Sequence, residues 1–164
     1  MTLAGCGDSA EGPTLAPPAE PRTLELDWVE RDNATRFTYR VERLVIAGDG
    51  WRLTFSMTNG SRGTYRVDDG DIGLVLLETQ TRAELRRLTG NLTHPPPALK
   101  PTAASPPSPT AVGPGASWSA TVSGSEELRA GSVVRVLFGP LSPVERFRSE
   151  AQDILWVTDQ SVRL

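Results

Sequence analysis

The chain has 164 residues, of which 38% are hydrophobic, and its formal net charge is −3. This length and hydrophobic content fit one globular domain with a core of its own. No run of basic residues and no 18-residue apolar run occurs, which argues against nucleic acid as a partner and against a membrane-spanning helix. The single cysteine, Cys6, excludes an internal disulfide and a metal site made from paired cysteines.

The cysteine lies near the N-terminus in the stretch Leu3-Ala4-Gly5-Cys6, and the small or polar residues Gly7-Asp8-Ser9 follow it. This stretch resembles the lipobox of bacterial lipoproteins, in which a Leu, a small residue and a Gly or Ala precede the cysteine. The resemblance implies that the thiol of Cys6 carries a diacylglyceryl group and that a type II signal peptidase cuts before it. Two acyl chains would anchor the protein stably, because each buried methylene contributes about 0.8 kcal/mol.

The five residues before Cys6 lack the charged and apolar regions of a complete signal peptide. We therefore expect translation of the natural protein to start upstream; the alternative is a cytosolic protein with an exposed thiol. The resemblance implies a lipid anchor in the cell membrane, with the domain on the extracytoplasmic side. Residues 7–22 are rich in Gly and Pro and have no apolar periodicity, so residues 1–22 are predicted to be a lipobox remnant and flexible tether.

Apolar residues then recur at every second position, which is typical of β-strands that are buried on one face. The clearest strand is 51–58, where Trp51, Leu53, Phe55 and Met57 share one face. A bulge is predicted near Glu42-Arg43 and a hairpin turn at 48–50. The continuous apolar run 72–77 predicts a strand that is buried on both faces. The other strands predicted in this half are 23–30, 37–46 and 65–67.

Two segments interrupt this rhythm. Thr81 and Glu84 have the spacing of a capping box and Leu85 and Leu88 have helical spacing, so 82–89 is predicted to be a short helix. The dense prolines of 91–115 predict a disordered loop in polyproline II form, without strands. We expect this loop to be dispensable for folding, and to be either a spacer or a recognition element for an aromatic groove.

Further strands are predicted at 117–124, 132–141 and, long or broken, at 153–164. Seven to nine strands with turns every 8–12 residues favour an all-β, immunoglobulin-like antiparallel β-sandwich over 23–164, and a small β-barrel is the alternative. The stretches "LTFSMTNGSRGTYRV" (53–67) and "GSVVRVLFGPL" (131–141) resemble the immunoglobulin-like ectodomains of bacterial lipoproteins.

Several residues are candidates for chemistry. His94, the single histidine, lies beside three prolines in the predicted loop, where a catalytic base would not be held in place. The turn at 68–71 offers carboxylates for calcium but lacks the spacing of an EF-hand loop, and a polar hairpin turn explains it equally well. Three asparagines match the N-glycosylation pattern, which we expect to be chance. The candidate calcium ligands are Asp68, Asp69 and Asp71, and the three asparagines are Asn33, Asn59 and Asn91.

Four tryptophans lie in strand patterns, at positions 28, 51, 118 and 156. We expect them in the core rather than exposed to a carbohydrate or protein partner. Together these features predict a non-enzymatic, lipid-anchored binding module without a cofactor, whose partners are the bilayer and an envelope protein. The alternatives are a carrier with an apolar pocket and an envelope hydrolase that uses Asp68 or Glu78. The oligomeric state stays open.

Overall fold

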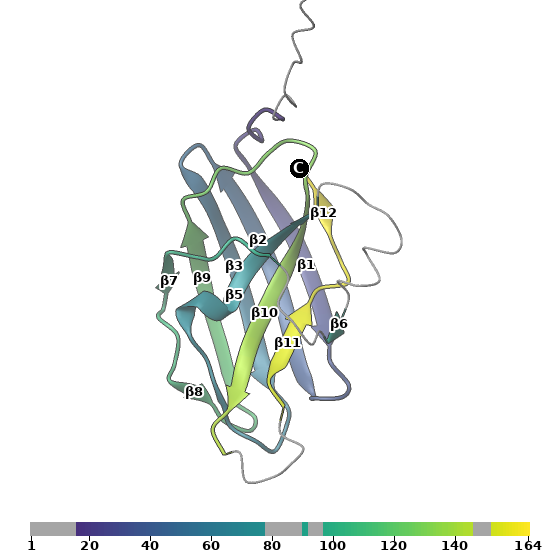
Figure 1. Cartoon of the computed structure of the whole chain (residues 1–164), viewed down its shortest axis with the longest axis vertical. Helices are drawn as coiled ribbons and strands as arrows, with labels where there is room; N and C mark the ends of the chain where they lie inside the picture. Colours follow the sequence, from purple (N-terminus) through teal and green to yellow (C-terminus); the bar gives the residue numbers. More distant parts are fainter. Residues whose placement is uncertain (1–15, 78–89, 92–96, 146–151) are drawn as a thin grey trace, which may run out of the picture.

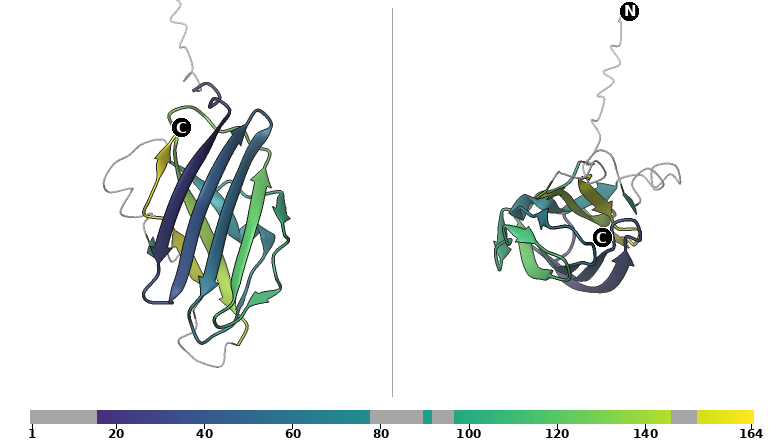
Figure 2. Two further views of the ribbon diagram at one scale, coloured as in Figure 1. Left: turned by 180° about the vertical axis from the view of Figure 1, so that it is seen from behind. Right: turned by 90° about the horizontal axis from the view of Figure 1, so that it is seen from below.

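A computed structural model describes residues 16–77, 90–91, 97–145 and 152–164. Two antiparallel β-sheets pack face to face (Figure 1). The first sheet has the order β1-β2-β3-β9-β7, and Figure 2 shows it from behind. Its strands are β1 (Arg22–Arg31), β2 (Phe37–Ala47), β3 (Gly50–Asn59), β9 (Ser117–Gly124) and β7 (Ala103–Ser105).

The second sheet is organised around the long strand β10 (Val133–Pro143). It has the order β6-β11-β10-β4-β8, and two further strands, β5 and β12, pair with β10. A single 3₁₀ turn, η1 (Asp69–Asp71), precedes β5. The remaining strands are β4 (Tyr65–Arg66), β5 (Ile72–Leu77), β6 (Gly90–Asn91), β8 (Ala111–Val112), β11 (Ile154–Val157) and β12 (Val162–Arg163).

The strand order confirms the prediction of an immunoglobulin-like sandwich. The order β2-β3-β9-β7 corresponds to strands A-B-E-D of a constant-type immunoglobulin domain, and β5-β10-β11 corresponds to C-F-G. β1 is an additional N-terminal strand beside β2. Within the described residues no strand pairing joins the two sheets, so the alternative of a closed barrel is wrong.

The core lies between the sheets, and aromatic rings connect the two. The predicted inner face of β3 is confirmed, because its four apolar side chains at 51, 53, 55 and 57 are almost completely buried. Phe55 packs edge-on against Trp118 of the same sheet, with the ring centroids 5.0 Å apart. From the second sheet, Phe138 lies 5.7 Å from Phe55 and 4.6 Å from Tyr39. These contacts hold the middle of the sandwich.

A second apolar cluster lies on the other face of the second sheet. Val134 and Val136 of β10 face the core, whereas Val133 and Leu137 alternate to the opposite side. Since both faces of β5 are also apolar and buried, the prediction for the run 72–77 is confirmed. The cluster, against which Ala98 packs, consists of Val75, Leu77, Val133, Leu137, Leu155 and Val157.

Two irregularities bend the first sheet. The register between β2 and β3 shifts between Val41 and Arg43, which confirms the predicted bulge. A second shift in β1, between Glu25 and Trp28, was not predicted. There the backbone of Asp27 is left-handed, with φ of 50°. The alternation of buried and exposed side chains continues through this bulge: Leu24 and Leu26 pack against the core and Trp28 is buried, while Val29 is half exposed.

The prediction of a disordered proline-rich loop is wrong for residues 97–115. Leu99 and Leu74 exchange two backbone hydrogen bonds of 2.8 and 3.0 Å, and the amide of Thr102 donates to Ser123 at 2.8 Å. β7 and β8 form within this stretch, and Val112 is buried. Both strands lie at sheet edges. Proline has no backbone N–H to donate, and at a sheet edge this costs no hydrogen bond because no neighbouring strand lies on that side. The prolines therefore restrict the stretch to an edge instead of excluding strands.

The N-terminal boundary of the fold also differs from the prediction. Residues 16–21, predicted as tether, lie against the turn that precedes β10. The amide of Ala19 donates to Leu128 at 2.7 Å, and the amide of Ala130 donates to Pro17 at 2.8 Å. Cys6, the predicted helix 82–89, Glu78 and His94 lie outside the described residues.

Candidate functional site

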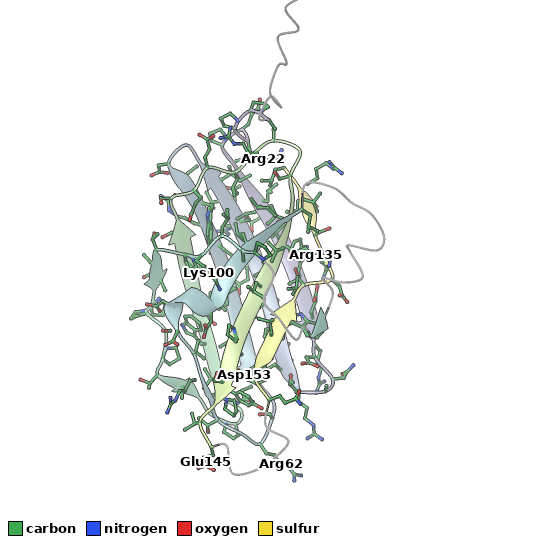
Figure 3. The ribbon with its side chains drawn as sticks, viewed as in Figure 1. Arg22, Arg62, Lys100, Arg135, Glu145 and Asp153 are labelled. Carbon is green, nitrogen blue, oxygen red and sulfur yellow. The ribbon has the colours of Figure 1, made fainter. Side chains whose placement is uncertain are left out.

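A depression of about 540 Å³ lies at one end of the sandwich, where three segments meet. They are the β1–β2 turn, the β3–β4 connection and the start of β11. Figure 3 shows Arg62 and Asp153 at this end and Arg22, at the start of β1, at the opposite end. The depression is lined by Ala34, Thr35, Arg36, Ser61, Arg62, Tyr65, Gln152, Asp153 and Ile154.

The place of this depression in the fold is informative. The chain from β3 to β5 corresponds to the B–C connection of an immunoglobulin domain, and the chain from β10 to β11 corresponds to the F–G connection. These two connections contribute to the antigen-binding end of variable domains. The correspondence is an analogy of position, so the chemistry has to be judged from the residues themselves.

Asp32 fixes the β1–β2 turn. Its buried carboxylate accepts hydrogen bonds from the amide of Ala34, at 2.9 Å, and from the hydroxyl of Thr35. The Asp32 carbonyl accepts the amide of Arg36 at 2.7 Å. Arg36 is held with φ of 64°, in the left-handed region that a non-glycine residue adopts only at a steric cost. These hydrogen bonds hold the turn, and Arg36 lies within it.

Asn59 fixes the second turn in the same way. Its side chain is fully buried; the Nδ2 atom donates to the carbonyls of Gly63 and Val112, at 2.8 and 2.9 Å, and Oδ1 accepts the amide of Ser61 at 2.9 Å. Because this nitrogen is buried and occupied, the glycosylation pattern at Asn59 marks a turn and not an acceptor. Of the other two candidate acceptors, Asn33 is exposed and Asn91 lies in β6.

The two turns also bind each other. The amide of Gly60 donates to the carbonyl of Arg36 at 3.0 Å. A Cβ atom at position 60 would lie 2.4 Å from that oxygen, so the approach requires glycine. Arg36 and Ser61 are therefore held beside each other by backbone contacts.

Charged groups in the lining have no partner in the described part of the chain. The ion pairs described there are Arg43–Glu25, Arg52–Asp49 and Arg129–Glu127, and none of them lies in the depression. Among the described residues of the lining, Arg36, Arg62 and Asp153 together leave one positive charge. Burial raises the pKa of Tyr65; its hydroxyl, like that of an ordinary tyrosine, is protonated at neutral pH and able to donate.

Tyr39 lies close to this group of residues. Its ring is buried between Phe138 and Trp156, at centroid distances of 4.6 and 5.6 Å. Burial, together with the nearby groups of Asp32 and Tyr65, raises the pKa of Tyr39. Its hydroxyl has no hydrogen-bond partner among the described residues. An unsatisfied buried hydroxyl costs about 1–3 kcal/mol, which the packing of the ring between Phe138 and Trp156 has to offset.

The acidic turn at 68–71 has a structural use for its side chains. Asp71 accepts the amide of Asp68 at 2.7 Å, and Asp69 accepts the amide of Ser108 at 2.8 Å. Burial raises the pKa of Asp71 to about 6, whereas the bonds from Ser108 lower the pKa of Asp69. Lys100 donates to the carbonyl of Gly70 at 2.7 Å. In the described ranges no three acidic, His or Cys side chains form a group suited to a metal ion, so the calcium site gains no support.

The tryptophans are core residues as predicted, with one exception. Trp28, Trp51 and Trp118 are at most 7% exposed. Trp156 is half-buried, and its Nε1 atom donates to the carboxylate of Glu30 at 3.0 Å. The other oxygen of Glu30 accepts the amide of Gln160 at 2.9 Å. Trp156 thus ties β11 to β1.

Sequence reasoning missed the residues of the depression. Asn59-Gly60 is a turn signal, and Asp32 three residues before Thr35 is another, but neither says that the two turns touch. Arg36, Arg62 and Asp153 carry no motif at all. Their proximity follows only from the pairing of β2 with β3 and from the packing of β11 beneath them.

Across the residues that the structure describes, no helix has the length and apolar character needed to cross a bilayer. Comparisons with protein-family models, with curated proteins and with solved structures found no match to this chain. The function is therefore inferred from the sequence motif, the fold and the geometry of the depression.

Proposed function

We propose that the protein is a lipid-anchored, extracytoplasmic binding module without catalytic activity, and that it binds its ligand in the depression formed by residues 34–36, 61, 62, 65 and 152–154. The observation that carries this proposal is the position of the depression at the end of the sandwich opposite to the entry of the chain.

The entry of the chain defines an attachment end. Pro17 and Ala19 pair with Leu128 and Ala130, and the terminal residue Leu164 pairs with Ser132 at 2.9 Å. Figure 1 places the C-terminus and the start of β1 at this end. A lipid on Cys6 would therefore hold the attachment end toward the bilayer, only a short stretch of chain away.

β1 explains how the depression comes to lie at the far end. Without β1 the chain would enter the sandwich at Phe37, beside the depression. With 10 residues at about 3.3 Å per residue, β1 moves the point of entry by roughly 33 Å. An anchored domain of this form turns its B–C and F–G connections away from the membrane, toward ligands in the envelope or outside the cell.

The depression has the properties of a binding site. Its volume lies within the range of small-ligand sites, about 300–1,000 Å³. Both turns are fixed by buried side chains before any ligand arrives, which reduces the entropy lost on binding. The hydroxyl of Ser61 is bonded to Asn59 at 2.6 Å, an amide that cannot act as a base. Binding without chemistry is the use that this arrangement supports.

One experiment tests the anchor. The chain is expressed in a bacterium behind an added lipoprotein signal segment, beside a Cys6→Ser variant. We expect the parent chain to fractionate with membranes and to carry the mass of the acyl groups, and the variant to remain unlipidated. Unchanged membrane retention and mass in the variant would contradict the lipoprotein proposal.

A second experiment tests the binding end. The unique thiol of Cys6 allows attachment of the chain to a maleimide surface; a Cys6→Ser, Arg62→Cys chain is attached through the depression instead. An extract of bacterial envelope is passed over both surfaces, and retained components are identified by mass spectrometry. We expect components that the first surface retains and the second does not. Equal retention, or none, would contradict this part of the proposal.

A further inference from the structure

We infer that the depression recognises a single carboxylate on a hydroxyl-rich scaffold, that is, a sugar acid, either free or as a unit of an acidic glycan. This inference rests on the proposed binding function and names the class of its ligand. Three features of the lining carry it: the charge balance, the conformation of Arg36, and the neutral polar groups around the arginines.

The charge balance favours one negative charge. Arg36 and Arg62 contribute two guanidinium groups and Asp153 one carboxylate, and none of the three has an ion-pair partner among the described residues. A guanidinium group matches the planar geometry of a carboxylate and binds it through two parallel hydrogen bonds. A phosphate monoester carries close to two charges at neutral pH and would meet the repulsion of Asp153. A monoanion fits the described residues of the lining better.

Arg36 occupies a backbone position that glycine would fill at lower steric cost. The left-handed conformation is sterically unfavourable for residues with a side chain, and Arg36 adopts it with φ of 64°. The contact with Gly60 fixes this conformation from the other turn. A strained residue at a cavity is a reason to look for a function of its side chain, and the guanidinium group supplies one.

The neutral groups indicate the rest of the ligand. Gln152 offers an amide and Tyr65 a protonated hydroxyl, and the carboxylate of Asp153 can accept hydrogen bonds from ligand hydroxyls. Tyr65 packs edge-on against Phe37 at 5.3 Å, which holds its ring at the border of the depression. Donors and acceptors of this kind fit the hydroxyls of a sugar ring, whereas an apolar ligand would leave them unpaired.

The test uses the full chain and three small probes that share one ring: glucuronate, glucose and glucose 6-phosphate. Affinities are measured by calorimetry for the parent chain and for Arg36→Gly and Arg62→Gln. The matched control is Arg43→Gln, which alters an arginine paired with Glu25 on the first sheet. We expect glucuronate to bind with a Kd on the order of 1 mM, and both depression variants to weaken it at least about tenfold, the effect of one lost charge-assisted contact. The control should leave it unchanged.

Each other outcome overturns the inference. Tighter binding of glucose 6-phosphate would assign the site to phosphates, and equal binding of glucose would remove the role of the charge. Binding that survives both depression variants would place the carboxylate elsewhere. No saturable binding of glucuronate at about 10 mM, well above the expected Kd, would also contradict it. The proposed function stands or falls separately, on the two attachment experiments.

Discussion

The chain is held in place at the two ends of the sandwich by different kinds of hydrogen bonds. At the attachment end, backbone groups of Pro17 and Ala19 pair with Leu128 and Ala130. At the depression end, the buried side chains of Asp32 and Asn59 accept and donate the hydrogen bonds that hold the turns. Backbone pairing of this kind extends a sheet, so the paired segments have little freedom to vary in conformation. Turns held by side chains keep their own exposed side chains free to form a site.

This contrast predicts the largest loss of stability at Asn59. Asn59→Ala removes the side-chain bonds to Gly63, Val112 and Ser61 and leaves the buried carbonyl of Val112 without this partner. We expect the free energy of unfolding in urea to fall by about 2–4 kcal/mol, because each unsatisfied buried group costs roughly 1–3 kcal/mol. The control is Asn33→Ala, an exposed asparagine in the neighbouring turn, which should change it by less than about 0.5 kcal/mol. Equal effects would show that the turns are not held by Asn59.

Shortening the chain at the attachment end should have a smaller effect. A chain of residues 20–164 lacks the hydrogen bonds of Pro17 and Ala19 and the burial of Ala19. We expect it to lose about 1–2 kcal/mol relative to a chain of residues 16–164, since a net backbone hydrogen bond contributes about 0.5–1.5 kcal/mol. Binding at the depression should not change. A loss larger than that of Asn59→Ala would reverse the comparison between the two ends.

Asp71 lies at neither end and should make stability depend on pH. Burial raises its pKa from 3.8 to about 6, so between about pH 4 and 6 the folded chain binds more protons than the unfolded chain. The stability that Asp71 contributes is therefore present in acid and lost as pH rises through this window. We expect Asp71→Asn to be more stable than the parent at pH 7, with the difference shrinking toward pH 4, because the charged form that burial disfavours is absent from the variant. A difference independent of pH would contradict the raised pKa.

The smallest effect is expected for Arg36→Gly. Relief of the left-handed conformation, about 1–2 kcal/mol, should offset the added freedom of glycine in the unfolded chain, about 0.5–1 kcal/mol. Thermal unfolding should therefore show an unchanged or slightly raised Tm. A clear loss of stability would mean that the side chain of Arg36 is needed by the fold, which would remove the reason to assign it to a ligand.

The sequence predicted the fold well and the site poorly, for identifiable reasons. Period-two patterns such as that of 51–58 report which face of a strand is buried, and the bulge near Glu42-Arg43 interrupts such a pattern visibly. The prolines of 97–115 were misread because composition does not say whether a segment lies at a sheet edge. The depression was missed because Arg36, Arg62 and Asp153 are brought together only by strand pairing and packing.

The most direct test of the central claim is to locate the bound ligand. Backbone amide signals of the full chain are assigned by NMR and followed while glucuronate is added. We predict that the shifts concentrate at residues 34–36, 61–65 and 152–154, and that residues 17–19 and 128–130 of the attachment end do not respond. Shifts centred on the attachment end, or spread evenly over the sandwich, would contradict the assignment of the depression as the binding site.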